Sequence, residues 1–203
     1  MNEDGKQPAM EQHQETAWIK AFLAGDRSAF DKLVMRHQDK VFNLCYRLLG
    51  DYEDASDCAQ EAFVKVYRSL KDFRFGSSFS TWLYAVAVNT CKNKLKSAEY
   101  RRRKRMIPID DPPEVSDGGK TVREIEDPSP SPLAQLVDKE RERLLQSAID
   151  DLPPDARTVV VLRDVEGLSY EEIVRVTGHN VGTLKSKLAR ARQQLREKLQ
   201  GVV

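Results

Sequence analysis

The segment LSYEEIVRVTGHNVGTLKSKLARARQQLREKL, residues 168–199, decides the fold of the C-terminal half of this chain. It contains two amphipathic helical patterns on either side of Gly178, a residue that permits the left-handed backbone of a tight turn. Ser169 and Glu172 form the pattern of a capping box at the start of the first helix. Asn180 can cap the second helix by accepting hydrogen bonds from the amides that follow it. Two helices joined by such a turn are the layout of a helix-turn-helix.

The second of these helices combines an apolar stripe with a basic surface. Residues 181–199 hold six lysines and arginines and one acidic residue. A helix of this kind can enter the major groove of DNA, where side chains near its N-terminus reach base edges and later cations reach phosphates. The alternative interpretation is a solvated basic face on an ordinary helix. We predict a buried stripe of Leu184, Leu188, Ala191, Leu195 and Leu199, and DNA binding by His179, Asn180, Thr183, Lys185, Ser186, Lys187 and Arg190.

The composition limits the class of protein. The chain has 203 residues, with 33 Lys and Arg, 32 Asp and Glu, and a net charge of +1. Its three cysteines share no disulfide or metal-ligand spacing with one another or with the three histidines, which favours a reducing compartment and predicts neither a metal site nor a cofactor. The polar N-terminus lacks a signal-peptide core, and no apolar run reaches the ~18 residues of a membrane span. We expect a soluble, cytoplasmic protein without membrane insertion.

The nearly neutral total conceals separate blocks of charge. Residues 92–105 hold eight cations and one anion, whereas residues 106–130 hold seven acids and two cations. Together with the basic helix of residues 181–199, two basic blocks flank an acidic one. Such separation is typical of chains that bind polyanions.

Helical periodicity without a convincing strand predicts an all-α chain with two small helical domains. Residues 1–13 are polar and without period, and we expect a disordered tail there. Residues 14–105 form the first domain. Residues 106–132 contain six prolines and two adjacent glycines, which predicts an acidic, Pro-rich, flexible linker. Residues 133–203 form the second domain, which ends in the helix-turn-helix.

The first domain contains an acidic helix over residues 51–69. Gly50 is suited to end the helix before it, and Ser78 or Ser80 is suited to cap the next helix. We expect Cys45 and Cys58 in the core, because both lie on apolar stripes and small buried cysteines are usually structural. One side of the acidic helix is apolar, and we expect the opposite side to expose Asp51, Glu53, Asp54, Asp57 and Glu61.

Long stretches of both domains resemble a known family. The segment LPPDARTVVVLRDVEGLSYEEIVRVTGHNVGTLKSKLARARQQL closely resembles region 4, the promoter-reading domain of bacterial extracytoplasmic-function (ECF) sigma factors. The segments FLAGDRSAFDKLVMRHQDKVFNLCYRLLGDYEDASDCAQEAFVKVYRSL and FSTWLYAVAVNTCKNKLK resemble region 2 of the same family. The resemblance spans about residues 15–100 and 133–199, in the order that the family shows.

The resemblance implies a function and a set of partners. A sigma factor binds core RNA polymerase, here through the beta-prime clamp helices and the beta flap, and directs it to promoter DNA. Region 4 recognises the −35 element, while region 2 recognises the −10 element and promotes melting of the start site. Family members are often held inactive by an anti-sigma factor, and we expect such a partner.

The resemblance also suggests sites in region 2. The acidic helix matches the segment that binds the clamp helices, and an acidic face suits a basic partner. Pockets for flipped bases combine aromatic walls, polar edges and nearby cations, as found in DFRFGSSFSTWLYAVAVNTCKNKLK at residues 72–96. The candidates for polymerase binding are Asp54, Asp57, Gln60 and Glu61. The candidates for −10 recognition and melting are Phe75, Ser77, Ser78, Asn89, Lys92, Asn93 and Lys96.

The turn and the recognition helix depart from the family pattern. His179 and Asn180 stand where the family commonly shows an aliphatic residue and Pro, and Leu184 and Lys187 stand where Val and Arg are common. Because Lys cannot make the two-pronged contact of Arg with guanine, we expect a different preference for the upstream element. His179 either contacts DNA or faces solvent.

Three other classes of protein were weighed against a sigma factor. An autonomous helix-turn-helix transcriptional regulator would read DNA alone, usually as a dimer, but the sequence shows neither a receiver-like strand pattern nor a dimerisation helix with sustained heptads. We expect no enzyme, because the sequence shows no nucleophile–base arrangement, metal cluster or Gly-rich phosphate loop. The basic blocks argue against an interaction protein such as an anti-sigma factor.

Overall fold

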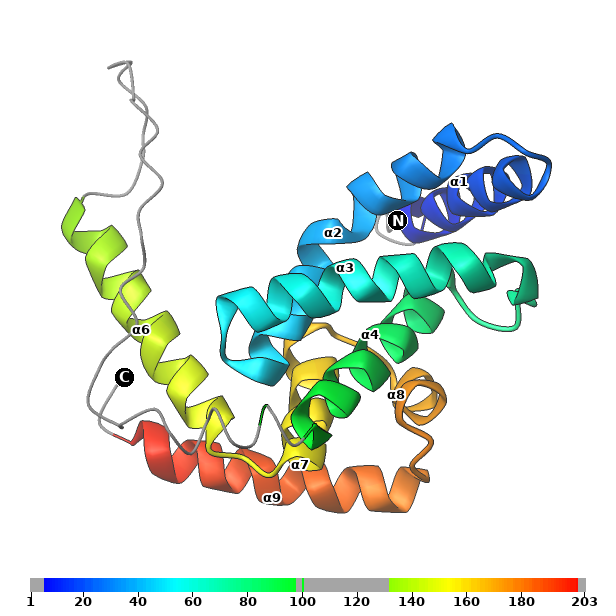
Figure 1. The fold of residues 1–203 in the computed structure, drawn as a ribbon. Helices are drawn as coiled ribbons and strands as arrows, with labels where there is room; N and C mark the ends of the chain where they lie inside the picture. The colour runs from blue at the N-terminus through cyan, green and yellow to red at the C-terminus, as the bar shows by residue number, and fades with distance from the viewer. Residues whose placement is uncertain (1–5, 98–99, 101–131, 201–203) are drawn as a thin grey trace.

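The fold is all-α over the residues that the structure, a computed structural model, describes: residues 6–97, residue 100 and residues 132–200. No strand occurs in these residues, which confirms the predicted fold class. The first domain contains α1 (Lys6–Leu23), α2 (Ser28–Leu49), α3 (Tyr52–Ser69), the 3₁₀ turn η2 (Leu70–Asp72) and α4 (Phe79–Lys96). The second contains α6 (Pro132–Asp150), α7 (Pro154–Val160), the π-helical turn η3 (Val161–Val165), α8 (Tyr170–Thr177) and α9 (Val181–Leu199) (Figure 1).

The N-terminal boundary differs from the prediction. The expectation of a disordered tail over residues 1–13 is wrong for residues 6–13, because α1 begins at Lys6. The first turns are rich in Ala, Met, Glu and Gln, which are good helix formers, and they extend a helix that is packed from Glu15 onward. The predicted linker, apart from Pro132, and the basic run 101–105 lie outside the described residues.

Helices α2, α3 and α4 form a bundle whose ends are set by local signals. Gly50 ends α2 in the left-handed conformation, with a φ of 72°. The Ser78 hydroxyl caps α4 by accepting a hydrogen bond from the Thr81 amide at 3.1 Å. Both capping predictions are therefore confirmed, with Ser78 rather than Ser80 as the cap. Each helix of the described residues is too short or too polar to cross a bilayer.

Three cysteines from three helices meet in the core of this bundle. Cys45 of α2, Cys58 of α3 and Cys91 of α4 are each at most 1% exposed. A hydrogen bond with the Cys91 thiol, followed by burial, raises the pKa of Cys58. A hydrogen bond with the Cys45 thiol, together with burial, raises the pKa of Cys91. The core position predicted for Cys45 and Cys58 is confirmed.

The second domain assembles on α9. In Figure 1, α9 runs along one edge of the molecule, with α6 and α7 against it and α8 at its N-terminal end. Pro154 begins α7, and Gly167 turns the chain toward α8 with a φ of 72°. The core of the domain contains Val159, Val160, Leu162, Ile173, Leu184 and Leu188.

The two domains pack on each other, which the sequence does not predict. Their buried apolar side chains form one continuous cluster. Helix α8 lies beside α4 (Figure 1). There the Thr81 hydroxyl donates a hydrogen bond to Glu172 at 3.1 Å, and the Tyr84 hydroxyl donates one to Glu166 at 2.8 Å.

Arg157 of α7 makes a second connection between the domains. Its buried guanidinium donates a hydrogen bond to the Leu48 carbonyl at the end of α2, at 2.7 Å, and pairs with the Asp150 carboxylate at 3.2 Å. Asp150 also approaches Gly50, since a Cβ atom built on Gly50 would lie 2.8 Å from the carboxyl carbon of Asp150. The missing side chain of Gly50 therefore permits the close contact of α2 with α6.

We predict that all three thiols are inert in the folded protein. The thiolate is the reactive form of cysteine. Burial protects all three thiols, and the raised pKa values of Cys58 and Cys91 suppress the thiolate further at these two positions. A colorimetric thiol reagent at mildly alkaline pH should react slowly with the native chain and rapidly with all three thiols in concentrated guanidinium chloride. A Ser56→Cys control, at an exposed position of α3, should add one fast-reacting thiol. Rapid reaction of the parent chain would contradict the prediction.

Candidate nucleic-acid interface

The helix-turn-helix of the second domain is built by two side-chain caps and one glycine. The Ser169 hydroxyl accepts a hydrogen bond from the Glu172 amide at 3.2 Å, and the Ser169 amide donates one to the Glu172 carboxylate at 2.9 Å. Gly178 adopts a φ of 73°. The Asn180 side chain accepts a hydrogen bond from the Thr183 amide at 2.8 Å. The predicted capping box, turn glycine and cap of α9 are therefore all confirmed.

Helix α9 buries its apolar stripe mainly over its first half. Leu184, Leu188 and Ala191 are buried, whereas Leu195 and Leu199 are half-buried. The opposite side of the same turns faces solvent and is free to approach a DNA groove. Of the residues predicted to bind DNA, Thr183 is half-buried, and those that are exposed are Asn180, Lys185, Ser186 and Arg190.

Two further candidates, His179 and Lys187, lie against the first turn of α7. Nζ of Lys187 is 3.0 Å from Oδ2 of Asp155, and Nε2 of His179 is 3.8 Å from the same oxygen. The hydrogen bond from Lys187 is the largest influence on the Asp155 carboxyl, whose pKa lies below its ordinary value. Both candidates are half-buried. In this structure they are therefore not on the exposed side of α9 that the other candidates share.

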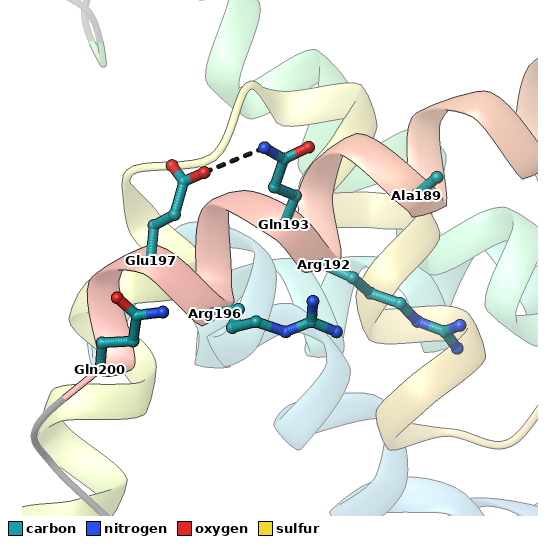
Figure 2. A pocket seen from close by; sticks show the side chains of 6 residues that line it. All are labelled: Ala189, Arg192, Gln193, Arg196, Glu197 and Gln200. Carbon is teal, nitrogen blue, oxygen red and sulfur yellow. Dashed lines mark hydrogen bonds between the residues drawn. The ribbon is translucent and has the colours of Figure 1, made fainter.

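The later turns of α9 carry a shallow groove with basic side chains (Figure 2). Arg192 and Arg196 point to one side, while Gln193 and Glu197 lie on another side and share a hydrogen bond of 3.0 Å. Asp164 holds Arg192 through two hydrogen bonds, of 3.0 and 2.5 Å, and the hydrogen bonding raises the pKa of Arg192. Exposed guanidinium groups at this distance from the turn suit contacts with phosphates rather than with bases.

The loop before α4 presents Phe75 in a strained conformation. Its φ is 55°, and no other non-glycine residue of the described chain has a positive φ. Such a backbone costs about 1–3 kcal/mol, yet the side chain is 46% exposed and packs edge-on against Phe73, with ring centroids 4.9 Å apart. Ser77 and Ser78 beside it are half-buried. An outward-held aromatic ring suits stacking on an unpaired base.

The candidates along α4 fall into two groups. Asn89, Asn93 and Lys96 are exposed, and their three- and four-residue spacing places them on one side of the helix. Lys92 is half-buried, and its Nζ lies 3.5 Å from Oδ1 of Asp155 in the other domain. Only the first group is open to solvent.

The acidic helix α3 exposes three of its four candidates, Asp57, Gln60 and Glu61. The expectation of an exposed Asp54 is wrong, because its side chain is 2% exposed and its carboxylate lies 3.0 Å from Nζ of Lys94 in α4. Position 54 lies one helical turn before the buried Cys58, on the edge of α3 that meets α4. Asp54 therefore ties two helices together.

Three acidic residues that connect the two domains are missing from the candidates predicted from the sequence. Asp155 and Glu172 can be recognised as acids in the first turns of helices, and Glu166 stands beside a turn glycine. Their partners in the other domain carry no signal in the sequence. Within the described residues, no group of His, Cys, Asp and Glu could hold a metal ion.

Comparisons with known proteins agree with this geometry. The family model for Sigma-70 region 2 matches residues 33–105, and the model for Sigma-70, region 4 matches residues 142–195. The chain is 39% identical to the RNA polymerase sigma-H factor of Pseudomonas aeruginosa, over 93% of this chain and 95% of that protein. It is also 38% identical to the ECF RNA polymerase sigma-E factor of Haemophilus influenzae, over 94% of this chain and 97% of that protein. This chain belongs to the ECF sigma factor family.

Two solved structures share the fold of this sigma factor. CnrH in complex with the cytosolic domain of CnrY superposes with a TM-score of 0.63 and 23% identity, over 93% of this chain and 96% of that one. The sigma factor RpoE of Bartonella quintana, in complex with the anti-sigma factor NepR, gives a TM-score of 0.59 and 22% identity, over 85% and 97%. The family models match region 2 to the first domain and region 4 to the second.

We predict that Asn180 stabilises region 4 as the cap of α9. Asn180→Ala removes the acceptor of the Thr183 amide and should lower the free energy of unfolding by about 1 kcal/mol. Asn180→Ser keeps an acceptor and should stay close to the parent. Urea denaturation followed by circular dichroism measures both variants, and equal losses for the two would contradict the assignment of a cap.

Acid should destabilise α8 through Glu172. Burial raises the pKa of Glu172, but hydrogen bonds from Ser169 and Thr81 outweigh it and hold the pKa below its ordinary value. A lowered folded-state pKa contributes stability above the unfolded-state pKa, and this stability is lost as pH falls through the folded-state pKa.

Glu172→Gln should therefore be less stable than the parent at neutral pH, with a difference that shrinks below about pH 4. Thermal unfolding across this pH range measures the effect, and Glu171→Gln, an exposed neighbour, is the control that should show little change. A difference that does not vary with pH would contradict the prediction.

Proposed function

We propose that this chain directs core RNA polymerase to specific promoters, with region 4 on the −35 element and region 2 on the −10 element during melting. One observation carries the proposal: a chain of the ECF family combines an exposed, capped recognition helix with a strained, outward-held Phe75 beside the polar side of α4. The first feature suits duplex DNA and the second suits a single strand. A sigma factor needs both.

Region 4 reads the upstream element through the start of α9. Asn180, Lys185 and Ser186 are exposed on the first turns, where side chains of a recognition helix reach base edges. Arg190 lies further along and contacts phosphate, which adds affinity but no sequence preference. Lys187 stands where the family commonly shows arginine. Because lysine offers one point charge where arginine offers a planar fork, the preference for guanine opposite Lys187 is weaker than an arginine would give.

Region 2 holds the melted strand on the side of α4 that begins at the Phe75 loop. The Phe75 ring stacks on a flipped base, and the Ser77 hydroxyl contacts the polar edge of that base. Asn89, Asn93 and Lys96 follow along α4, where they bind the backbone of the same strand. Ser78 contributes through its cap of α4, which positions the loop.

The polymerase-binding surface lies on α3. The exposed carboxylates of Asp57 and Glu61, with Gln60 between them, suit the basic beta-prime clamp helices. Asp54 supports this surface from behind by holding Lys94 and thereby α4. Region 4 docks separately on the beta flap, so that polymerase sets the distance between the two regions.

The partners follow from this role. The chain acts in the cytoplasm, where polymerase and promoter DNA are found, and contributes no catalytic residue, because the nucleotidyl transfer belongs to the polymerase. The Bartonella quintana protein of similar fold is bound to an anti-sigma factor, which supports an anti-sigma factor as the regulator of this chain.

Reconstituted run-off transcription tests the proposal. Purified chain, bacterial core polymerase and a genomic fragment library are combined, and the transcript starts are sequenced. Discrete starts that share two upstream elements and disappear without the chain are expected. No starts, together with specific binding of the chain alone to DNA, would instead favour an autonomous helix-turn-helix regulator.

We predict that Phe75 acts in melting and not in folding. Phe75→Gly removes the ring and also relieves the positive φ, so the urea midpoint should change little. Open-complex formation, measured by permanganate reactivity of thymines near the start site, should be strongly reduced, while binding to core polymerase is retained. Phe75→Tyr keeps the stacking surface and should retain activity. Wild-type melting by Phe75→Gly would refute the role.

A further inference from the structure

The ring of Tyr170 lies against two cations of region 4. Tyr170 is the first residue of α8, which lies at the N-terminal end of α9 (Figure 1). Cζ of Arg163 is 5.1 Å from the centre of the ring, and Nζ of Lys185 is 5.8 Å from the same centre. Both distances are within the roughly 6 Å over which the face of an aromatic ring attracts a cation. The sequence-based candidates for DNA binding include Lys185 but not the ring that it contacts.

Local structure fixes the position of this ring. The capping box of Ser169 and Glu172 sets the first turn of α8 and therefore the direction in which Tyr170 leaves the helix. The ring is half-buried and packs on the apolar core. Nη1 of Arg163 donates a hydrogen bond to the Leu168 carbonyl at 2.6 Å, so the guanidinium that contacts the ring is held as well. The ring therefore offers the neighbouring helix a surface of fixed position.

Lys185 has a different kind of partner from other cations of α9. Carboxylates of region 4 pair with Lys187, Arg192 and Lys198. Among the described residues no carboxylate forms an ion pair with Lys185, and its ammonium contacts the ring of Tyr170. Because the ring carries no charge, Lys185 keeps its full positive charge and its N–H donors.

The kind of partner decides what DNA must displace. A phosphate or base that approaches Lys187 competes with the carboxylate of Asp155 for one ammonium. At Lys185 no carboxylate competes, and the side chain is exposed on the early turns of α9, where base edges are within reach. A lysine that is already ordered loses less side-chain entropy when it binds. The ring thus lowers the ordering cost of this contact without neutralising the cation.

We propose that Tyr170 is a positioning residue for upstream-element recognition: its ring holds the ammonium of Lys185 in place before DNA is bound. Arg163 supports this arrangement from η3 by holding the ring. The proposal rests on the proposed function, because it refines the assignment of Lys185 to the −35 element. Helix α8 then contributes to the sequence preference of α9 through a side chain that reads no base itself.

Nuclear magnetic resonance measures the contact in the free chain. An aromatic ring shifts the resonances of protons above its face upfield, so the ε-methylene protons of Lys185 should lie upfield of those of other exposed lysines. Lys185→Met assigns the resonance by its loss. Tyr170→Phe keeps the ring and should keep the shift, whereas Tyr170→Leu should abolish it. An ordinary position of the Lys185 resonance in the parent chain overturns the proposal.

Transcription by the holoenzyme measures the consequence for promoter choice. Core polymerase with each variant transcribes a library in which the −35 element is randomised and each template carries a transcribed barcode. Lys185→Met should relax the base preference at the position that this lysine reads. Tyr170→Leu should relax the preference about two- to fivefold at that same position and leave the other positions unchanged. Tyr170→Phe should retain the parental preference.

A double variant separates positioning from folding. In Lys185→Met the ring has no ammonium to hold, so the addition of Tyr170→Leu should not change the preference further. A purely structural role would instead lower the urea midpoint of Tyr170→Leu and weaken transcription equally for every upstream sequence. Tyr52→Leu removes an exposed tyrosine ring of region 2 and is the matched control, which should keep the parental preference.

Two results of the transcription assay count against Tyr170 as a positioning residue. One is a parental preference in Tyr170→Leu, and the other is a loss spread evenly over all positions of the element. If the parent chain gives no transcripts with core polymerase, the proposed function fails. The lysine resonances of the free chain then still decide whether the ring holds Lys185.

Discussion

The buried guanidinium of Arg157 determines how regions 2 and 4 meet. Burying a charged group is costly unless acceptors meet its donors. Here the two terminal nitrogens of the guanidinium meet the carbonyls of Leu48, Asp150 and Leu152 and the carboxylate of Asp150, whereas Nε has no hydrogen-bond partner among the described residues. The last carbonyls of a helix lack partners within that helix, so one side chain completes the ends of α2 and α6. The lack of a side chain at Gly50 lets these ends approach. The relative placement of α2, α6 and α7 depends on this contact.

Internal ion pairs explain how an almost neutral chain carries a basic recognition helix. Several cations of α9 are matched by acids of region 4 itself, including Asp155 with Lys187, Asp164 with Arg192, and Asp151 with Lys198. Partly exposed pairs of this kind contribute little net stability. In the proposed complex with DNA, phosphates would therefore replace these carboxylates at small cost.

Local sequence signals predicted the elements well. Ser169, Gly178 and Asn180 act as predicted because a cap or a left-handed turn depends only on residues within one turn of it. The prediction of an exposed Asp54 failed because the helical pattern separates only an apolar face from a polar face. The position of α4 decides which polar residues at the edge of the apolar face are buried. The positive φ of Phe75 also lies beyond sequence reasoning, since no residue type or spacing in the loop signals it.

The sequence alone determined the two helical regions, their family and the helix-turn-helix, because helical periodicity, capping and turn chemistry are short-range properties of the chain. Only the tertiary structure decided that three cysteines from three helices share one core, that Asp54 is buried against Lys94, and that Asp155 holds lysines of both regions. These contacts join residues far apart in the sequence. Their geometry follows from how helices pack and how buried polar groups find partners, which no local pattern encodes.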